Sequence, residues 1–204
     1  NQEELTDISL GIDLGLKDLA ICSDGTVYKN INKTYMVRKI EKRLKRLQKQ
    51  VSRKYEKNKK GKEYVKTKNI IKLEKQIQQV HRRLANIRNN YLHQTTTNIV
   101  KTKPYRVVIE DLAVSDMMKN KHLSDDIRKQ GFSEFRRQLE YKCNFRGIKF
   151  VVADRFYPSS KSCSQCGKIK KDLKLKDRVY KCSCGLNIDR DLNASINLSK
   201  YKSA

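Results

Sequence analysis

Apolar positions at the start of the chain fall into three short runs separated by polar and glycine positions. Residues 8–14 read ISLGIDL, residues 19–22 read LAIC and residues 26–31 read TVYKNI. Between the second and third runs lies Asp24-Gly25, a two-residue turn signal that is typical of a β-hairpin. We therefore predict that the chain opens with three antiparallel strands.

The pattern changes between residues 35 and 92, where apolar side chains recur every three or four positions. The recurrence breaks around residues 58–61 and then resumes. It predicts two helices joined by a basic turn and packed along one apolar seam: Ile40, Leu44, Leu47, Val51, Ile70, Leu73, Ile77, Val80, Leu84, Ile87 and Tyr91. His81 and His93 lie in this segment, and we assign them no chemistry.

Downstream of this hairpin, strand-like and helix-like patterns alternate. Residues 105–110 (YRVVIE) and 148–153 (IKFVVA) read as strands, and residues 132–145 and 187–198 have helical spacing. The intervening residues 115–131 are polar, and we expect them to be irregular and mobile. Three antiparallel strands followed by alternating helix and strand is the element order of an RNase H-like domain of the α/β (α+β) class. In that fold the first and fourth strands run side by side and parallel.

The charge of the chain indicates its partner. Lysine and arginine number 47 against 22 acidic residues, a formal charge of +25. Such an excess favours a polyanion, and nucleic acid is the usual one. Residues 37–92 alone hold 20 basic and 4 acidic residues, so we interpret the hairpin as a phosphate-facing surface that contacts the backbone without reading bases. No apolar run is long enough to span a membrane and no signal peptide is evident, so we expect no membrane partner.

Two closely spaced cysteine pairs predict a zinc ribbon. One pair is C-x-x-C and the other C-x-C, each followed by glycine and separated by 15 residues: Cys163, Cys166, Cys182 and Cys184. Four thiolates close the coordination sphere of Zn²⁺, which favours a structural role. The alternative is two disulfides, although nothing in the sequence points to secretion. The remaining Cys22 and Cys143 lie in apolar surroundings, and we expect them to be buried and inert.

Three carboxylates are candidates for a second kind of metal site. Asp13 lies on the first strand, Glu110 ends the fourth strand and Asp191 belongs to the final helix. Each of them alone could be a surface or capping residue. Brought together by the fold, they would hold two Mg²⁺ or Mn²⁺ ions. In that arrangement Asp13 bridges both ions, Glu110 binds one and Asp191 binds the other.

The combined motifs resemble the C-terminal half of the TnpB (OrfB) family of insertion-sequence proteins. The similar stretches are GIDLGLKDLAICSDG, VVIEDLAV, FSEFRRQLEYK, YPSSKSCSQCG and CSCGLNIDRDLNASINL. The resemblance implies an RNase H-like (RuvC) nuclease of the kind found in RNA-guided DNA endonucleases related to type V CRISPR effectors. It assigns the RuvC core to residues 1–160 with the basic insertion at 35–92, a target-binding zinc ribbon to 161–187 and the final RuvC helix to 188–204.

The resemblance also bears on the site residues, the partners and the location. The family's aspartate lies in a D-x-N-A motif, here beginning at Asp191, and Asp189 is the alternative. The partners implied are target DNA, guide RNA and an N-terminal half with recognition and wedge parts, which we expect to be missing because the chain begins at Asn1. We expect a prokaryotic-type cytoplasmic protein associated with the nucleoid. Two other functions stay open: a guided DNA-binding module that does not cleave, and a guide-independent nuclease.

Overall fold

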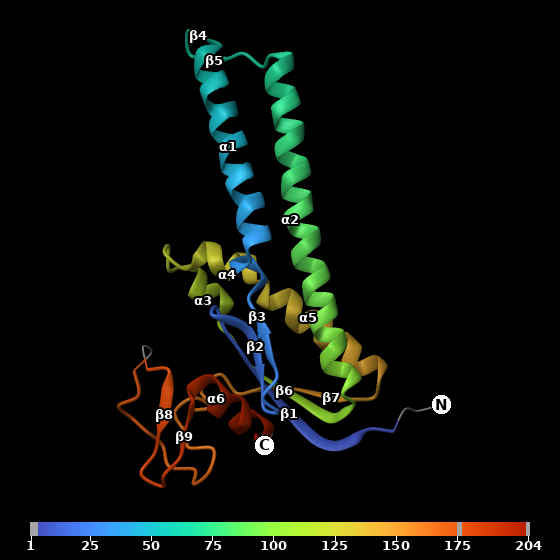
Figure 1. Ribbon diagram of the computed structural model, residues 1–204, viewed down its shortest axis with the longest axis vertical. Coiled ribbons are helices and arrows are strands. Elements are labelled where there is room, and N and C mark those ends of the chain that lie inside the picture. The colour runs from blue at the N-terminus through green and yellow to red at the C-terminus, as the bar shows by residue number, and fades with distance from the viewer. Residues whose placement is uncertain (1–3, 175–176, 203–204) are drawn as a thin grey trace. The chain divides into compact units, whose positions relative to one another are not determined.

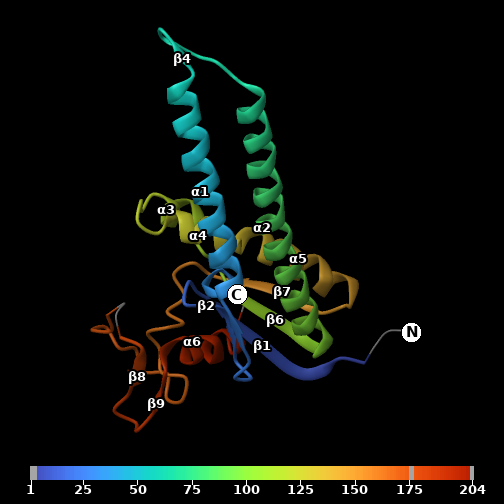
Figure 2. The ribbon, with the colours of Figure 1, turned by 45° about the horizontal axis from the view of Figure 1, so that its top comes forward.

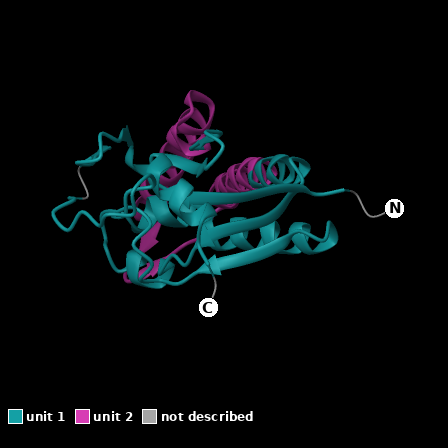
Figure 3. Ribbon diagram, turned by 90° about the horizontal axis from the view of Figure 1, so that it is seen from below, with its two compact units in different colours: residues 1–30, 92–204 teal, residues 31–91 magenta. Residues whose placement is uncertain are grey.

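The computed structural model describes residues 4–174 and 177–202 and divides the chain into two compact units (Figure 3). Unit 1 comprises residues 1–30 and 92–204, and unit 2 comprises residues 31–91. Among the helices formed by the described residues, none combines the length and apolar character that crossing a membrane requires.

Unit 1 is built on a five-stranded sheet in the order β3-β2-β1-β6-β7 (Figure 1). Its strands are β1 (Thr6–Leu14), β2 (Asp18–Cys22), β3 (Val27–Lys29), β6 (Pro104–Glu110) and β7 (Lys149–Ala153). The first three are antiparallel, whereas β6 pairs parallel with both β1 and β7. Gly25 has φ 86°, as the tight turn before β3 requires. Both the opening antiparallel strands and the parallel pairing of the first and fourth strands are therefore confirmed.

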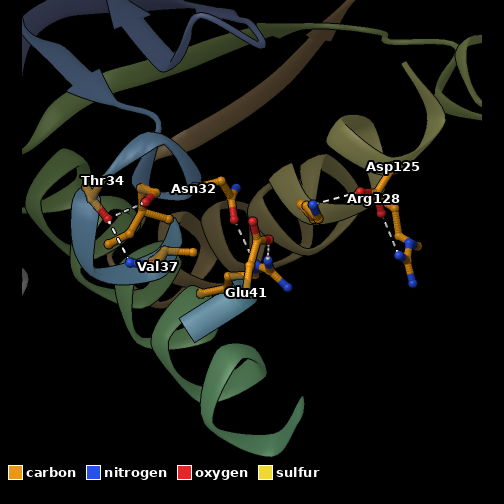
Figure 4. A network of polar contacts seen from close by, with 9 residues as sticks. Asn32, Thr34, Val37, Glu41, Asp125 and Arg128 are labelled. Carbon is orange, nitrogen blue, oxygen red and sulfur yellow. Dashed lines mark hydrogen bonds and ion pairs between the residues drawn. The ribbon is translucent and has the colours of Figure 1, made fainter. Parts of the chain in front are cut away.

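Four helices belong wholly to unit 1: α3 (Val114–Met118), α4 (Ser124–Gln130), α5 (Phe132–Phe145) and α6 (Arg190–Ser199). The expectation that residues 115–131 are irregular is wrong, because they contain most of α3 and all of α4. In α4 the carboxylate of Asp125 is 2.6 Å from Arg128 and 2.7 Å from Lys129 (Figure 4). Acid in the first turn and base in the last turn both complement the helix dipole. Gly131, at φ 70°, then ends the helix.

The final helix begins later than predicted. Residues 187–189 form strand β9 (Asn187–Asp189), which pairs antiparallel with β8 (Val179–Lys181). Asp189 is the N-cap of α6, and its Oδ1 accepts hydrogen bonds from the backbone N–H groups of Asp191 and Leu192. The strand pairing and the cap together fix the start of α6 at Arg190, so the predicted boundary at residue 188 falls within β9.

Unit 2 is a helical hairpin, as predicted. It contains η1 (Ile31–Lys33), α1 (Tyr35–Lys57), β4 (Lys59–Lys60), β5 (Glu63–Tyr64) and the first part of α2 (Lys68–Lys101). The two helices run side by side (Figure 2). Their buried seam is the predicted one, with Ile40, Leu44 and Leu47 of α1 against Val80 and Leu84 of α2.

Polar contacts fix the base of this hairpin. Thr34 caps α1 by accepting a hydrogen bond from the Val37 N–H (Figure 4). Arg88 donates to Asn32 at 2.7 Å and to Glu41 at 2.9 Å. These contacts tie α2 to the start of α1 within the unit.

Helix α2 continues beyond the predicted end at residue 92 and contributes residues 92–101 to unit 1. The added segment includes three threonines, which are weak helix formers. Packing compensates, since Thr96 is fully buried and donates a hydrogen bond to the Leu92 carbonyl at 2.8 Å. Lys142 of α5 donates to the hydroxyls of Thr96 and Thr97 at 2.6 and 2.8 Å. Tertiary contacts thus extend a helix that local propensity would have ended.

Candidate functional site: a carboxylate centre beside a four-cysteine cluster

The register of two parallel strands sets the positions of Asp13 and Glu110. Ile12 of β1 is paired with Ile109 of β6, so the next residue on each strand lies at the same level of the sheet. Aligned positions on neighbouring strands place their side chains on the same face. Asp13 and Glu110 are therefore neighbours at the carboxyl ends of adjacent strands.

Asp191 approaches this pair from α6, which packs directly on β1. Gly11 lies so close to the helix that a Cβ built there would be 2.0 Å from the Ser195 carbonyl oxygen. Asp191 stands in the first turn of α6 and is mostly buried, with its side chain 18% exposed. A glycine in β1 thus lets the helix come near enough to bring a third carboxylate to the strand ends.

Burial and the charges of neighbouring carboxylates raise the pKa of Asp13 and the pKa of Glu110. Burial raises the pKa of Asp13 well above its usual value, and the charges of Glu110 and Asp191 raise it further. Burial also raises the pKa of Glu110 to about 7, against a hydrogen bond from the Leu14 backbone that lowers it, and the Asp191 charge adds to the rise. Burial and mutual proximity disfavour the ionised forms of Asp13 and Glu110, and a bound divalent cation would stabilise those forms.

The structure also distinguishes Asp191 from Asp189. The Oδ1 atom of Asp189 is engaged as the N-cap of α6, whereas Asp191 affects the pKa of both Asp13 and Glu110. Asp189 affects only Asp13 in this way, and it is the last of the causes of that shift. Asp189 is therefore engaged in capping α6, whereas the charge of Asp191 acts on both other carboxylates.

Arg190 is a member of this centre that the sequence pattern did not single out. Its guanidinium donates to Asp191 Oδ1 through Nε at 3.1 Å and Nη2 at 2.9 Å, and its charge lowers the pKa of Asp13. Arg178 lies farther off, 3.9 Å from Asp191 Oδ2. The sequence does not predict this contact. An arginine that precedes an aspartate can point in several directions, and the direction of the Arg190 side chain depends on where α6 begins.

The donor atoms of the three carboxylates suit a hard divalent cation. Each side chain offers carboxylate oxygens, which are ligands that Mg²⁺ and Mn²⁺ prefer in proteins. Asp13, Glu110 and Asp191 are therefore the side chains of this centre that could hold such a metal.

The four predicted ribbon cysteines do form one compact cluster. Their Sγ atoms all lie within 4.8 Å of one another, with Cys163 to Cys184 and Cys166 to Cys182 both at 3.6 Å. A disulfide would need about 2.05 Å. A tetrahedron with Zn–S bonds of about 2.3 Å instead puts its sulfurs nearly 3.8 Å apart. The cysteines are thus free thiols in an arrangement that can hold zinc, and the disulfide alternative does not hold.

Glycines and hydrogen bonds shape the two turns that present the thiols. Gly167 and Gly185 have φ 74° and 96°, which residues with a Cβ rarely adopt. The Cys184 backbone N–H lowers the pKa of the Cys182 thiol to about 6. The pKa of the Cys184 thiol rises to about 12 against a hydrogen bond from the Leu186 backbone that lowers it, because desolvation and hydrogen bonds with the other three thiols raise it. Four thiolates packed this closely repel one another, and a bound cation would offset that repulsion.

Two asparagines on α6 anchor the first cysteine turn. Asn193 Nδ2 donates to the Ser162 carbonyl at 2.7 Å, and its Oδ1 accepts from the Ser164 N–H at 3.0 Å. Asn197 Nδ2 donates to the carbonyls of Ser159 and Ser162, each at 2.7 Å. Helix α6, which carries Asp191, is therefore hydrogen-bonded to the backbone around Cys163 through two asparagines four residues apart. The sequence analysis did not predict this role of Asn193 and Asn197.

The other two cysteines are buried, as predicted. Cys22 is 1% exposed on β2 and Cys143 is fully buried on α5. Burial raises the pKa of each thiol to about 12. A thiol with such a pKa is almost entirely protonated near neutral pH.

Comparison with known proteins gives two family matches. Residues 1–121 match the OrfB family model described as “Probable transposase”, and residues 132–198 match the model “Cas12f1-like, TNB domain”.

Curated relatives cover nearly the whole chain. A Streptomyces pristinaespiralis protein and InsQ of Escherichia coli K12 share the name “Putative RNA-guided DNA endonuclease”. They are 37% identical over 95% and 35% identical over 93% of this chain. A TnpB-like protein of Acanthamoeba polyphaga mimivirus is 30% identical over 94% of it. This chain covers 45%, 48% and 37% of those proteins, so it spans about half their length or less.

Solved structures share the mixed α/β fold. A CRISPR-Cas12f ternary complex aligns with all of this chain at a TM-score of 0.72 and 24% identity, over 41% of its own chain. A Cas12f1–sgRNA–target DNA complex aligns with 97% of this chain at a TM-score of 0.59 and 19% identity, over 51% of its own chain.

Proposed function

Because this chain belongs to the OrfB (TnpB) transposase family, we propose that it carries the nuclease centre of an RNA-guided, metal-dependent DNA endonuclease. The observation that supports the proposal is the meeting of three carboxylates from separate segments: Asp13 and Glu110 at the same level of β1 and β6, and Asp191 in the first turn of α6, which packs closely on β1. The sheet order and the parallel β1–β6 pair are consistent with an RNase H-like fold of the RuvC type.

In this proposal the three carboxylates share one task. Asp13, Glu110 and Asp191 would together hold two divalent ions. When bound, such ions would supply an activated water on one side of a phosphodiester and charge neutralisation at the leaving oxygen. The Leu14 backbone orients Glu110 by a hydrogen bond, and the cap on Asp189 fixes the turn that presents Asp191.

The remaining parts serve nucleic-acid binding. The four-cysteine cluster is a structural zinc ribbon that contacts target DNA. Unit 2 contacts phosphates of the guide or of the heteroduplex through exposed side chains of α1, among them Lys42, Arg43, Lys45, Arg46 and Lys49. This chain matches 45% and 48% of the length of two curated relatives, and we place the guide-recognition and wedge parts in the remainder of such a full-length protein.

Cleavage of labelled single-stranded DNA in Mg²⁺ or Mn²⁺ tests the centre. We expect cutting by the wild-type chain to be lost in Asp13→Asn, Glu110→Gln and Asp191→Asn, while DNA binding remains. Asp189→Asn is the matched control, because asparagine caps a helix about as well as aspartate. Normal cutting by Asp13→Asn would refute the metal centre. DNA binding without any cutting by the wild type would favour a binding module over a nuclease for these 204 residues.

A further inference from the structure

A cleft in unit 1 adjoins the carboxylate centre and has a different chemistry. It encloses about 400 Å³, and Glu110 lines it together with the loop that follows β6 and the first turns of α5. That volume lies within the range of small-ligand sites. Leu112 and Phe132 supply apolar surface, and three arginines supply positive charge: Arg136, Arg137 and Arg155.

Two of these arginines are held in place by one carboxylate. Asp111 Oδ2 accepts from Arg155 Nε at 3.1 Å and from its Nη2 at 2.9 Å, and Oδ1 accepts from Arg136 Nη1 at 3.3 Å. A guanidinium has five N–H donors in a fixed fork, so each arginine keeps donors beyond those given to Asp111. The side chains of Arg136 and Arg155 are 45% and 51% exposed. The two guanidinium groups are therefore oriented and accessible, and Asp111, which holds them, is the residue after Glu110.

The third arginine is engaged elsewhere. Arg137 donates through Nε and Nη2 to both oxygens of Glu134, at 2.7 and 2.8 Å. This bidentate pair neutralises its charge. Glu140 also lines the cleft and is exposed. Arg136 and Arg155 share one carboxylate, so these two arginines together keep a net positive charge, whereas the pair of Arg137 and Glu134 keeps none.

An exposed aromatic ring stands beside this pair in the chain. Phe156 follows Arg155 and is 87% exposed, although phenylalanine is normally among the buried residue types. The turn that carries it is ordered, since the Phe156 N–H donates to Asp154 Oδ1 at 2.8 Å and the Tyr157 N–H donates to the Asp154 carbonyl at 3.0 Å. An aromatic face next to phosphate-binding cations is the arrangement with which proteins hold single-stranded nucleic acid.

We propose that this arginine cleft, lined by Arg136 and Arg155 and followed in the chain by the exposed Phe156, binds single-stranded DNA next to the carboxylate centre. The two arginines hold a phosphodiester group, and Phe156 stacks on a neighbouring base. Asp111 is a positioning residue that orients both guanidinium groups. The proposal rests on the proposed nuclease function, for which it supplies the subsite that guides the strand toward Glu110.

Photochemical crosslinking tests the cleft without relying on cleavage. The whole 204-residue chain is mixed with a ten-nucleotide single strand that carries 5-iododeoxyuridine, irradiated, digested and analysed by mass spectrometry. We expect a crosslink at Phe156, with a yield at least about fivefold lower in Arg136→Ala and Arg155→Ala, in line with the loss of phosphate contacts. Phe156→Ala should remove it and weaken binding through lost stacking.

Matched controls separate the cleft from general charge and exposure. Phe145 is 86% exposed at the end of α5, and Arg128 is an exposed arginine already paired with Asp125. Phe145→Ala and Arg128→Ala should crosslink like the wild type. Asp111→Ala adds a net positive charge and yet should lower the yield, because the arginines lose their orientation. A higher yield in Asp111→Ala would overturn the positioning role.

The outcomes for the cleft and for the nuclease are independent. A wild-type crosslink that maps elsewhere, or cleft variants that crosslink and bind as the wild type does, would overturn the cleft even if Asp13-dependent cutting is observed. A crosslink at Phe156 in a chain that binds DNA but never cuts it would uphold the cleft and count against nuclease activity in these 204 residues. Thermal melts of every variant check folding, which we expect to be kept because these side chains are exposed or, for Asp111, half-buried.

Discussion

Gly11→Ala should destabilise unit 1 because it forces apart β1 and α6. A Cβ at this position would lie 2.0 Å from the Ser195 oxygen, 2.3 Å from the Ser199 nitrogen and 2.9 Å from the Leu198 carbonyl carbon. All three are backbone atoms, so no rotamer change relieves the clash. Optimal contacts between carbon atoms begin at about 3.5 Å, so the helix must withdraw by more than about 1 Å.

The expected cost is about 3 kcal/mol of unfolding free energy, the upper end of the usual range for overpacking. Withdrawal would also open the core around Leu198, which is fully buried against Val108 and Ala153. Urea denaturation followed by circular dichroism measures the change as a lower midpoint at similar slope. The same shift moves Asp191, so cleavage should fall together with stability.

Gly147→Ala is the matched control. Gly147 has φ 68° and open space around its Cβ position, so alanine there costs only the left-handed backbone strain of about 1 kcal/mol. If Gly11→Ala were no less stable than Gly147→Ala, the close approach of helix and strand would be refuted.

Three further predictions follow from specific contacts. In the zinc-loaded chain, a thiol reagent at pH 8 should react with the four ribbon cysteines only after a chelator is added, and with Cys22 and Cys143 only after denaturation, because burial raises their pKa to about 12; early reaction of all six would contradict their burial. Asn193→Ala should release zinc faster in a metal-indicator assay, since it frees the first cysteine turn from α6; an unchanged rate would show that the turn needs no anchor. Arg88→Met should lower the stability of unit 2 by about 1 kcal/mol through loss of a half-buried ion pair with Glu41, which helix melting by circular dichroism measures.

The sequence predicted those elements whose signal is local. Alternation and an Asp-Gly turn indicated the first hairpin, and an apolar seam indicated unit 2, because each pattern reports one buried face. Residues 115–131 lack such a face, and α3 and α4 depend on ion pairs and on a terminating glycine. The extension of α2 through three threonines depends on hydrogen bonds from α5, which no local pattern records.

The candidate carboxylate centre also combines features that the sequence predicts with features that depend on tertiary packing. The meeting of Asp13 and Glu110 was predictable, because once the first and fourth strands are taken as parallel neighbours, both carboxylates fall at strand ends of the same register. The choice of Asp191 over Asp189 rested on the resemblance alone, since the position of either residue depends on how closely α6 approaches β1 and on which aspartate caps the helix. Gly11 permits the approach, and Asp189 supplies the cap. The sheet thus positions Asp13 and Glu110, whereas Asp191 is positioned by the packing of α6. Because α6 is also hydrogen-bonded to the first cysteine turn, loss of zinc should displace Asp191 before it displaces the other two carboxylates.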